Sequence, residues 1–202
     1  MLRVGLTGGI GCGKTFVAAL LREQGIPVLD ADPLAQELMA PGGPAHESVR
    51  REFGDAILDA HGCMDRKKLA TIVFADPVRL AKLNALVHPH VRRAIEDQFA
   101  EWARPSGPPV GVVEAALLIE AGYQKLLDRL IVVWCLPQQQ RQRLKARGMG
   151  AEQIVSRKNA QMPQAAKRKY ATDEIDNSVT REHAREQVKR LVERLREQAE
   201  RT

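Results

Sequence analysis

Short apolar runs and amphipathic stretches alternate at the start of the chain. The alternation of apolar residues over positions 2–6 predicts a strand, and residues 15–23 carry apolar side chains at helical spacing. Residues 26–29 predict a second short strand, which ends at Asp30. Strands separated by helices are typical of a parallel sheet with right-handed crossovers.

The pattern becomes helical, and the strand signal disappears, between residues 33 and 109. Apolar residues recur at steps of three or four from Leu80 to Trp102, which predicts one long amphipathic helix. His88 and Pro89 lie within this pattern. A lone histidine there is more often structural than a ligand, and the proline predicts a kink or a restart of the helix. We interpret residues 33–107 as a helical insertion.

Strand patterns return at residues 110–113, 130–134 and 174–176. A basic, mainly helical segment lies between the last two of these, over about residues 137–168. A terminal helix follows the last strand. Its predicted core face consists of Ala184, Val188, Leu191, Val192, Leu195 and Ala199.

The composition indicates a folded protein, because 44% of the 202 residues are hydrophobic and 28% are charged. The net charge of +6 fits either solvated arginine-rich helices or a site for polyanions, and charge alone does not separate the two. Only 4% of residues are aromatic, which disfavours a base-stacking nucleic-acid surface. No apolar run reaches the roughly 20 residues of a membrane span, and no signal peptide is evident.

Three cysteines, Cys12, Cys63 and Cys135, are scattered along the chain without a C-x-x-C pair. Neither a zinc site nor a disulfide framework is therefore indicated, and an odd number of scattered thiols fits a reducing cytoplasm.

A glycine-rich loop follows the first strand and matches the pattern G-x-x-x-x-G-K-[ST]. It consists of Gly8, Gly9, Ile10, Gly11, Cys12, Gly13, Lys14 and Thr15. Glycines let successive backbone N–H groups point at phosphate oxygens, and the following helix adds its positive end. Lys14 would reach the β and γ phosphates, and the Thr15 hydroxyl would hold Mg²⁺. The alternative is a chance glycine-rich turn, but the strand before and the helix after favour nucleotide binding.

Carboxylates follow two predicted strands, at the edge where open parallel sheets bind ligands. Asp30 and Asp32 follow the second strand, and either is a candidate base for a hydroxyl nucleophile. Asp32 also suits the N-cap of the next helix, since Pro33 follows it. Glu114 follows the strand at residues 110–113, where it would orient Mg²⁺ or be an ordinary strand-end charge.

The basic segment carries many cations, and most of them must be solvated. An arginine can nevertheless stabilise the charge that spreads over a transferring phosphoryl group. Gly148 and Gly150 would let the segment move as a lid. The predicted fold class is therefore α/β, a P-loop NTPase-type parallel sheet flanked by helices. Its core comprises residues 1–32 and 108–202, with the helical substrate-binding insertion and a basic lid.

Several further motifs, in order along the chain, resemble those of one family. They are Gly5 to Gly11, Asp30-Ala-Asp32, Phe53-Gly54, Asp65-Arg66, His88-Pro89, Leu117-Leu-Ile-Glu120, Gln140-x-x-Arg143-x-x-x-Arg147, Ala160-Gln161 and Ile175-Asp-Asn177. Together they cover nearly the whole chain and resemble dephospho-CoA kinase. The loop alone is generic to P-loop proteins, whereas the combination is much more specific.

The resemblance implies the last step of coenzyme A synthesis, in which ATP phosphorylates the ribose 3′-hydroxyl of dephospho-CoA to give CoA and ADP. It implies ATP and Mg²⁺ as cofactors and dephospho-CoA as a small-molecule partner. We expect neither a nucleic-acid nor a membrane partner. We further expect a cytoplasmic monomer or weak homo-oligomer.

The resemblance also implies roles for individual residues. Asp32 would be the base, with Lys14 and Arg143 completing the catalytic set. The expected ATP-binding residues are the loop from Gly8 to Thr15 together with Phe16, Arg143, Arg147 and Asn177, the last near the adenine. The expected substrate-binding residues are Thr7, Asp32, Asp65, Arg66, His88 and Pro89, and the expected metal ligands are Thr15 and Glu114.

Some positions depart from the family pattern. Cys12 stands where serine is usual, and the sequence Glu114-Ala-Ala116 lacks a usual proline, which weakens the metal role of Glu114. Thr172 replaces a usual aspartate. The competing hypotheses are another small-molecule P-loop kinase, for a nucleoside, nucleotide or sugar acid, and a nucleic-acid-binding module. A GTPase is disfavoured because no N-K-x-D motif is evident.

Overall fold

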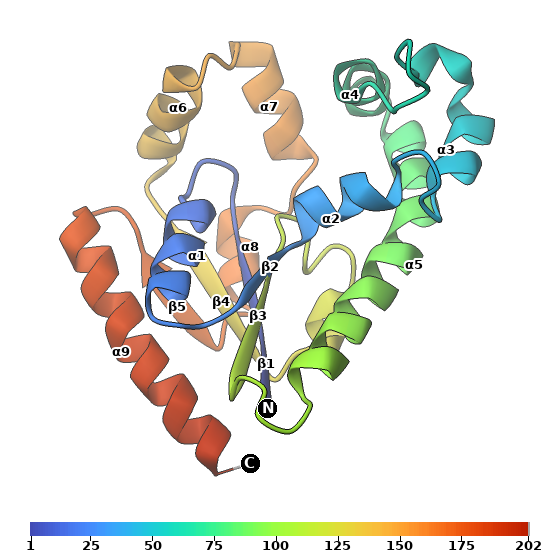
Figure 1. Cartoon of the computed structure of the whole chain (residues 1–202). Helices are drawn as coiled ribbons and strands as arrows, with labels where there is room; N and C mark the ends of the chain where they lie inside the picture. The colour runs from blue at the N-terminus through green and yellow to red at the C-terminus, as the bar shows by residue number, and fades with distance from the viewer. Residues whose placement is uncertain (202) are drawn as a thin grey trace. The chain divides into compact units, whose positions relative to one another are not determined.

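The computed structural model describes residues 1–201, which contain a five-stranded, all-parallel sheet (Figure 1). The strands are β1 (Leu2–Gly8), β2 (Val28–Asp30), β3 (Val110–Glu114), β4 (Arg129–Trp134) and β5 (Asp173–Asp176). Their order across the sheet is β2-β3-β1-β4-β5, so β1 is central. All five carboxyl ends therefore lie at one edge, and the predicted fold class is confirmed.

The helices account for most of the remaining described chain. They are α1 (Lys14–Glu23), α2 (Ala31–Leu38), α3 (His46–Phe53), α4 (Arg66–Ala75), α5 (Pro77–Trp102), α6 (Pro137–Ala146), α7 (Ala151–Asn159), α8 (Gln164–Arg168) and α9 (Arg181–Glu200), with 3-10 turns η1 (Asp55–Ile57) and η2 (Tyr123–Leu126). The chain divides into two compact units, one formed by residues 1–30 and 96–202 and the other by residues 31–95. That residues 33–107 form a substrate-binding insertion stays a prediction.

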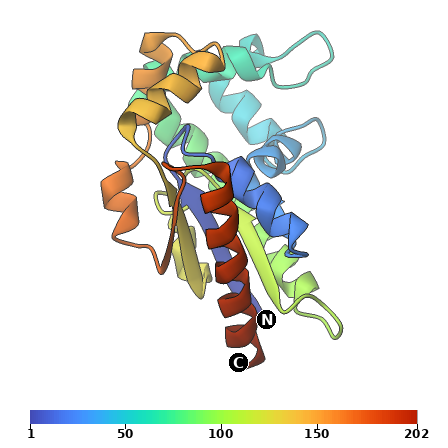
Figure 2. The ribbon, with the colours of Figure 1, turned by 90° about the vertical axis from the view of Figure 1, so that its left-hand side faces the viewer.

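Right-handed crossovers decide which helices cover which face of the sheet in the first unit. The connection from β1 to β2 runs one way across the sheet and that from β4 to β5 runs the other way, so their helices lie on opposite faces. Helix α9 packs beside α1 on one face, and α8 contacts β4 on the other (Figures 1 and 2).

The core of this unit lies between the sheet and the pair α1 and α9. Val4 and Leu6 of β1 are fully buried against Leu21 of α1 and Leu191 of α9. Burying a side chain of this size contributes about 1.5–3 kcal/mol. The predicted core face of the terminal helix is confirmed, since its residues from Ala184 to Leu195 are buried.

A glycine on β3 admits an aromatic ring on the other face. A side chain at Gly111 would collide with the indole of Trp102, which ends α5. Phe99 lies one turn earlier and meets Trp102 edge to face, with ring centroids 5.8 Å apart. These contacts attach the last two turns of α5 to the sheet.

The second unit is helical apart from one isolated antiparallel bridge between Leu58 and Met64. Asp65 is the N-cap of α4, where its carboxylate accepts hydrogen bonds from the backbone N–H groups of Lys67 (2.9 Å) and Lys68 (3.2 Å). Helix α5 continues through Pro89, so the expected restart there is wrong. The long amphipathic helix itself is confirmed.

Candidate functional site: a phosphate-binding loop with its flanking segments

The glycine-rich loop begins where the central strand β1 ends and leads directly into α1. The Cys12 N–H donates to the Gly9 carbonyl (3.1 Å), and the Phe16 N–H donates to the Gly13 carbonyl (3.1 Å). Gly13 has φ +94°, a left-handed conformation that other residues rarely adopt, and a Cβ there would collide with the Asn177 amide. The loop conformation therefore requires glycine at this position.

Two side chains from distant parts of the chain hold the loop by one carbonyl oxygen. The Asn177 amide donates to the Cys12 carbonyl at 2.7 Å, and the Arg143 guanidinium donates to the same oxygen at 3.4 Å. Arg143 also donates to the Asn177 carbonyl at 2.9 Å. Two predicted ATP-site residues are thus brought to the loop, although they come from α6 and from the end of β5.

The positive groups of the loop make it suited to binding an anion. The Lys14 ammonium donates to the Gly8 carbonyl at 3.2 Å, which folds the side chain over the loop. Thr15 is exposed in the first turn of α1, the positive end of the helix. A helix N-terminus preceded by a turn of N–H groups and a lysine is suited to a phosphate group.

Three glutamines from the basic segment border the loop, and a cavity of about 290 Å³ lies among them. The Ile10 N–H donates to Gln161 Oε1 at 3.0 Å. The Gln140 and Gln164 side chains both hydrogen bond to the Cys12 sulfur, at 3.1 and 2.7 Å. Gln140 and Gln161 lie in the family motifs, but we assigned none of the three glutamines a role from sequence, because glutamine carries no charge that points to a chemistry.

The carboxyl ends of β2 and β3 place two carboxylates side by side. Asp30 pairs with Glu114 in the strand register, and Glu114 pairs with Leu6 of β1 on its other side. Glu114 is only 5% exposed. The hydroxyl of Thr7, on β1, is buried and donates to the Ala116 carbonyl (3.4 Å) just after β3.

The candidate base Asp32 is exposed and lies inside the first turn of α2, one residue after its start. It is therefore not the N-cap, and the alternative that we considered from sequence is wrong. The boundary between the two compact units falls between Asp30 and Ala31.

A buried ion pair joins α8 to the chain that follows β3, and sequence reasoning missed it. Lys167 is fully buried, and its ammonium contacts Glu120 Oε1 at 2.9 Å and the Ala116 carbonyl at 2.6 Å. Burial lowers the pKa of Lys167, and the Glu120 carboxylate opposes that effect. Glu120 also accepts the Met162 N–H at 2.7 Å, so its carboxylate contacts the basic segment at two residues, Met162 and Lys167.

The predicted acceptor-binding residues of the second unit lie on two helices. Arg66 is exposed at the start of α4, directly after the cap residue Asp65. His88 is half-buried on α5, where burial lowers its pKa, and the adjacent Pro89 is exposed. Their expected role in binding the acceptor stays a prediction.

The two remaining predicted ATP-site residues differ in their surroundings. Arg147 is exposed and forms the C-cap of α6. Phe16 is partly buried, and the Arg181 guanidinium lies over its ring, 5.6 Å from the centroid.

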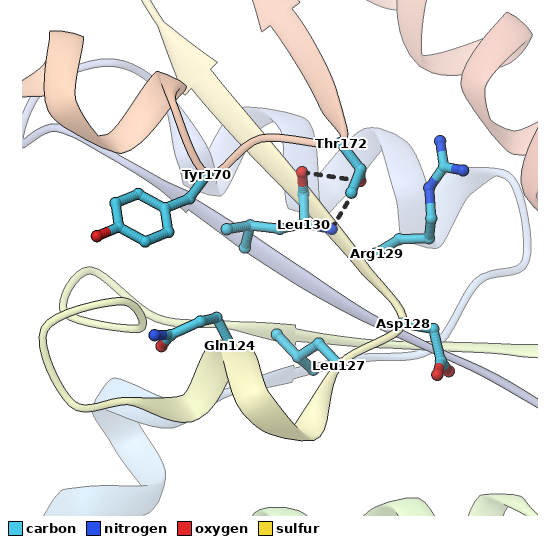
Figure 3. Close-up of a pocket in the computed structure, with 7 residues that line it drawn as sticks. All are labelled: Gln124, Leu127, Asp128, Arg129, Leu130, Tyr170 and Thr172. Carbon is cyan, nitrogen blue, oxygen red and sulfur yellow. Dashed lines mark hydrogen bonds between the residues drawn. The ribbon is translucent and has the colours of Figure 1, made fainter.

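A second cavity, of about 150 Å³, lies at the opposite edge of the sheet (Figure 3). Leu130, near the start of β4, and Thr172, just before β5, line it, and the Thr172 hydroxyl accepts the Leu130 N–H at 2.8 Å. Because both strands begin here, this cavity is remote from the phosphate loop, which follows the carboxyl end of β1.

A central parallel strand that leads through a Lys-Thr phosphate loop into a helix, bordered by a basic helical segment, defines a P-loop kinase. The family model described as dephospho-CoA kinase matches residues 2–184. The chain belongs to the dephospho-CoA kinase family.

The similar proteins support this conclusion over nearly the full length. A dephospho-CoA kinase of Aquifex aeolicus is 43% identical over 195 residues, which cover 96% of this chain and 98% of that protein. A solved structure from Thermus thermophilus has a TM-score of 0.79 at 36% identity and covers 95% of each chain. The dephospho-CoA kinase of Campylobacter jejuni covers 96% of this chain and 97% of its own, with a TM-score of 0.71 at 21% identity, and so shows the fold.

The described residues contain neither a membrane-spanning helix nor a cluster of metal-binding side chains. No helix between residues 1 and 201 is both long and apolar enough to cross a membrane. Within the same range, no three His, Cys, Asp or Glu side chains gather into a metal site.

Proposed function

We propose that this chain transfers the γ-phosphoryl group of ATP to the ribose 3′-hydroxyl of dephospho-CoA, giving CoA and ADP. The observation that carries the proposal is the phosphate loop from Gly8 to Thr15, at the carboxyl end of the central strand, in a chain of the dephospho-CoA kinase family. The reaction is the final step of coenzyme A biosynthesis. We propose that the reaction takes place in the cytoplasm, because a buried cysteine thiol in the phosphate loop, Cys12, suits a reducing compartment.

The loop would hold the triphosphate through its backbone N–H groups. On binding, Lys14 would exchange the Gly8 carbonyl for phosphate oxygens, a stronger, charge-assisted contact. Arg143 faces the same loop from α6 and is the candidate for stabilising charge on the transferring group. Arg147, one turn later at the exposed end of α6, would reach the phosphates only when the basic segment moves toward them.

The oxygen donors near the loop fit Mg²⁺. The hydroxyl of Thr15 and the carboxylate of Glu114 are hard ligands of the kind that Mg²⁺ prefers. Mg²⁺ in kinase sites is held by one or two protein groups together with the phosphates, so a site without a three-residue cluster agrees with this metal. Mg²⁺ would neutralise phosphate charge during transfer.

Asp32 would accept the proton of the 3′-hydroxyl as the oxygen attacks phosphorus. Its carboxylate is exposed in the first turn of α2, and it belongs to the unit formed by residues 31–95. We propose that this unit binds dephospho-CoA, with Asp65, Arg66, His88 and Pro89 on the acceptor side. Closure of the unit would bring base and acceptor to the phosphate loop together.

The test is ADP release, measured by a coupled assay with Mg²⁺, ATP and dephospho-CoA. Adenosine, shikimate and gluconate serve as alternative acceptors in parallel. We expect turnover with dephospho-CoA alone. Turnover with a nucleoside or a sugar acid, but none with dephospho-CoA, would show that the chain is another small-molecule kinase.

A further inference from the structure

Two of the three cysteines meet at the base of the phosphate loop, although 123 positions separate them (135 − 12). Cys12 lies within the loop, and Cys135 is the first residue after β4. Both side chains are fully buried, and each thiol lies close enough to the other to change its acidity. This contact exists because β1 and β4 are neighbours in the sheet, so that the segments following their carboxyl ends adjoin.

The surrounding polar groups hold the two sulfurs in place. Gln164 Oε1 accepts from the Cys12 thiol (2.7 Å) and from the Cys135 N–H (3.3 Å), so one side chain bridges both cysteines. Gln140 Nε2 donates to the Cys12 sulfur at 3.1 Å. The Cys135 thiol also contacts the Gly11 carbonyl at 3.9 Å. The Cys12 sulfur therefore accepts a hydrogen bond from Gln140, which favours its thiolate, and as a thiol it donates to Gln164.

The two thiols consequently differ in acidity. The hydrogen bonds from Cys135 and Gln140, with the charge of Lys14, lower the pKa of Cys12 to about 7, although burial opposes them. The same hydrogen bond raises the pKa of Cys135. A thiol with a lowered pKa beside a thiol with a raised pKa is the arrangement of an oxidisable cysteine with a resolving partner.

A small oxidant has room beside this pair, and it reaches the fully buried sulfurs when Gln140 or Gln164 moves. The cavity of about 290 Å³ above the loop is lined by Gln140 and Gln164, the two side chains that contact the Cys12 sulfur. Hydrogen peroxide is close to water in size, and such a cavity has room for several water molecules, at about 30 Å³ each. Gly9 and Ile10 of the loop form the adjacent wall.

We propose that Cys12 and Cys135 form a modification site at which a hydroperoxide converts the two thiols into an intramolecular disulfide. The Cys12 thiolate attacks one peroxide oxygen, the O–O bond breaks, and the sulfur becomes a sulfenic acid as hydroxide leaves. The Cys135 sulfur then attacks the Cys12 sulfur, and the S–O bond breaks with loss of water. The proton lost when Cys12 ionised neutralises the hydroxide, so two thiols and one peroxide give one disulfide and two waters.

The disulfide would displace the phosphate loop. An S–S bond is about 2.05 Å long, which is much shorter than a hydrogen-bond contact between two sulfurs. Drawing Cys12 toward Cys135 would pull on its backbone, whose carbonyl oxygen is held by Asn177 and Arg143. A misplacement of about 1 Å in a catalytic site can cost on the order of 100-fold in rate, so we expect oxidation to reduce turnover at least ~10-fold.

The experiment treats the purified, full-length chain with hydrogen peroxide, blocks remaining thiols by alkylation, and digests it with trypsin without reduction. Mass spectrometry should find the peptide of residues 4–14 linked to that of residues 130–141. Dithiothreitol should release the two peptides and restore turnover. The Cys63→Ser variant is the matched control, because Cys63 lies in the other unit, and it should behave like the parent.

A second variant separates the disulfide from other oxidative damage. Cys135→Ser preserves a small polar side chain outside the nucleotide-binding set, so it should keep basal turnover and resist inactivation by peroxide at least ~10-fold better than the parent. The proposal is overturned if peroxide leaves the two peptides unlinked, or if Cys135→Ser is inactivated as fast as the parent. The peptide linkage is measured without a substrate, so this result stands even if the chain fails to phosphorylate dephospho-CoA.

Discussion

Arg143 and Asn177 hold the phosphate loop by the same atom, the carbonyl oxygen of Cys12. The Asn177 amide donates to it at 2.7 Å and the Arg143 guanidinium at 3.4 Å, and Arg143 is itself fixed by the Asn177 carbonyl at 2.9 Å. Asn177 is only 7% exposed. The loop is therefore held in shape by two residues that the sequence associates with the nucleotide, and we predict that nucleotide binding depends on both.

The first prediction concerns Asn177→Ala. It leaves the Cys12 carbonyl with only the longer contact from Arg143, and a buried acceptor without a good partner costs about 1–3 kcal/mol. We expect a KM for ATP roughly 10-fold higher, since 1.4 kcal/mol corresponds to a factor of ten. Asn159→Ala, at the exposed end of α7, is the control and should leave the KM unchanged. An unaltered KM in Asn177→Ala would show that this hydrogen bond does not shape the loop.

The second prediction compares two glycines with left-handed backbone. Gly13 (φ +94°) faces the Asn177 amide, whereas Gly148 (φ +78°) has nothing within 4 Å of an added Cβ. Both alanine variants incur backbone strain of roughly 1–2 kcal/mol, but only Gly13→Ala also creates a collision. We expect Gly13→Ala to abolish measurable ATP binding in titration calorimetry, while Gly148→Ala lowers only the thermal midpoint. If both variants weakened ATP binding equally, backbone strain alone, without the collision, would explain the loss.

The third prediction is that Lys14→Ala loses turnover by on the order of 100-fold or more, because it removes charge stabilisation at the transferring phosphoryl group. Circular dichroism should show an unchanged fold, since Lys14 contributes one hydrogen bond, to the Gly8 carbonyl. Lys125→Ala, at an exposed position of η2, is the charge-matched control. Parental turnover in Lys14→Ala would contradict the assignment of the loop.

The fourth prediction concerns Asp32→Asn, which keeps the shape of the side chain but cannot accept a proton. We expect kcat to fall by roughly 100- to 10,000-fold with little change in ATP affinity, as for loss of a general base. Glu37→Gln, exposed on the same helix, is the matched control. If single-turnover rates of Asp32→Asn equal those of the parent, another group is the base.

The fifth prediction is the pH dependence of disulfide formation. Since the pKa of Cys12 is lowered from 9.0 to about 7, its thiolate is the minority form below pH 7 and the majority form above it. The peroxide reaction should therefore accelerate about tenfold per pH unit below pH 7 and level off above it. Gln140→Met removes a hydrogen bond that lowers this pKa, so it should move the profile to higher pH. A profile centred near pH 9 in the parent would contradict the shift.

The sequence by itself determined the features that depend on neighbouring residues. The pattern from Gly8 to Thr15 identified the phosphate loop, because glycine conformations and a helix start are local properties. The apolar spacing from Leu80 to Trp102 identified α5, because an amphipathic helix needs only its own periodicity. Pro89 showed the limit of local reasoning, since the helix continues through it.

Only the tertiary structure decided what surrounds the loop. The contact between Asn177 and Cys12 spans 165 positions, and that between Gln161 and Ile10 spans 151. Such contacts follow from the strand order, which places the end of β4 beside the end of β1 and the end of β5 one strand further along. The same order buried Lys167 against Glu120 and joined two cysteines that have no motif in common. Strand order arises from packing of the whole chain, so no local pattern predicts which side chains it brings together.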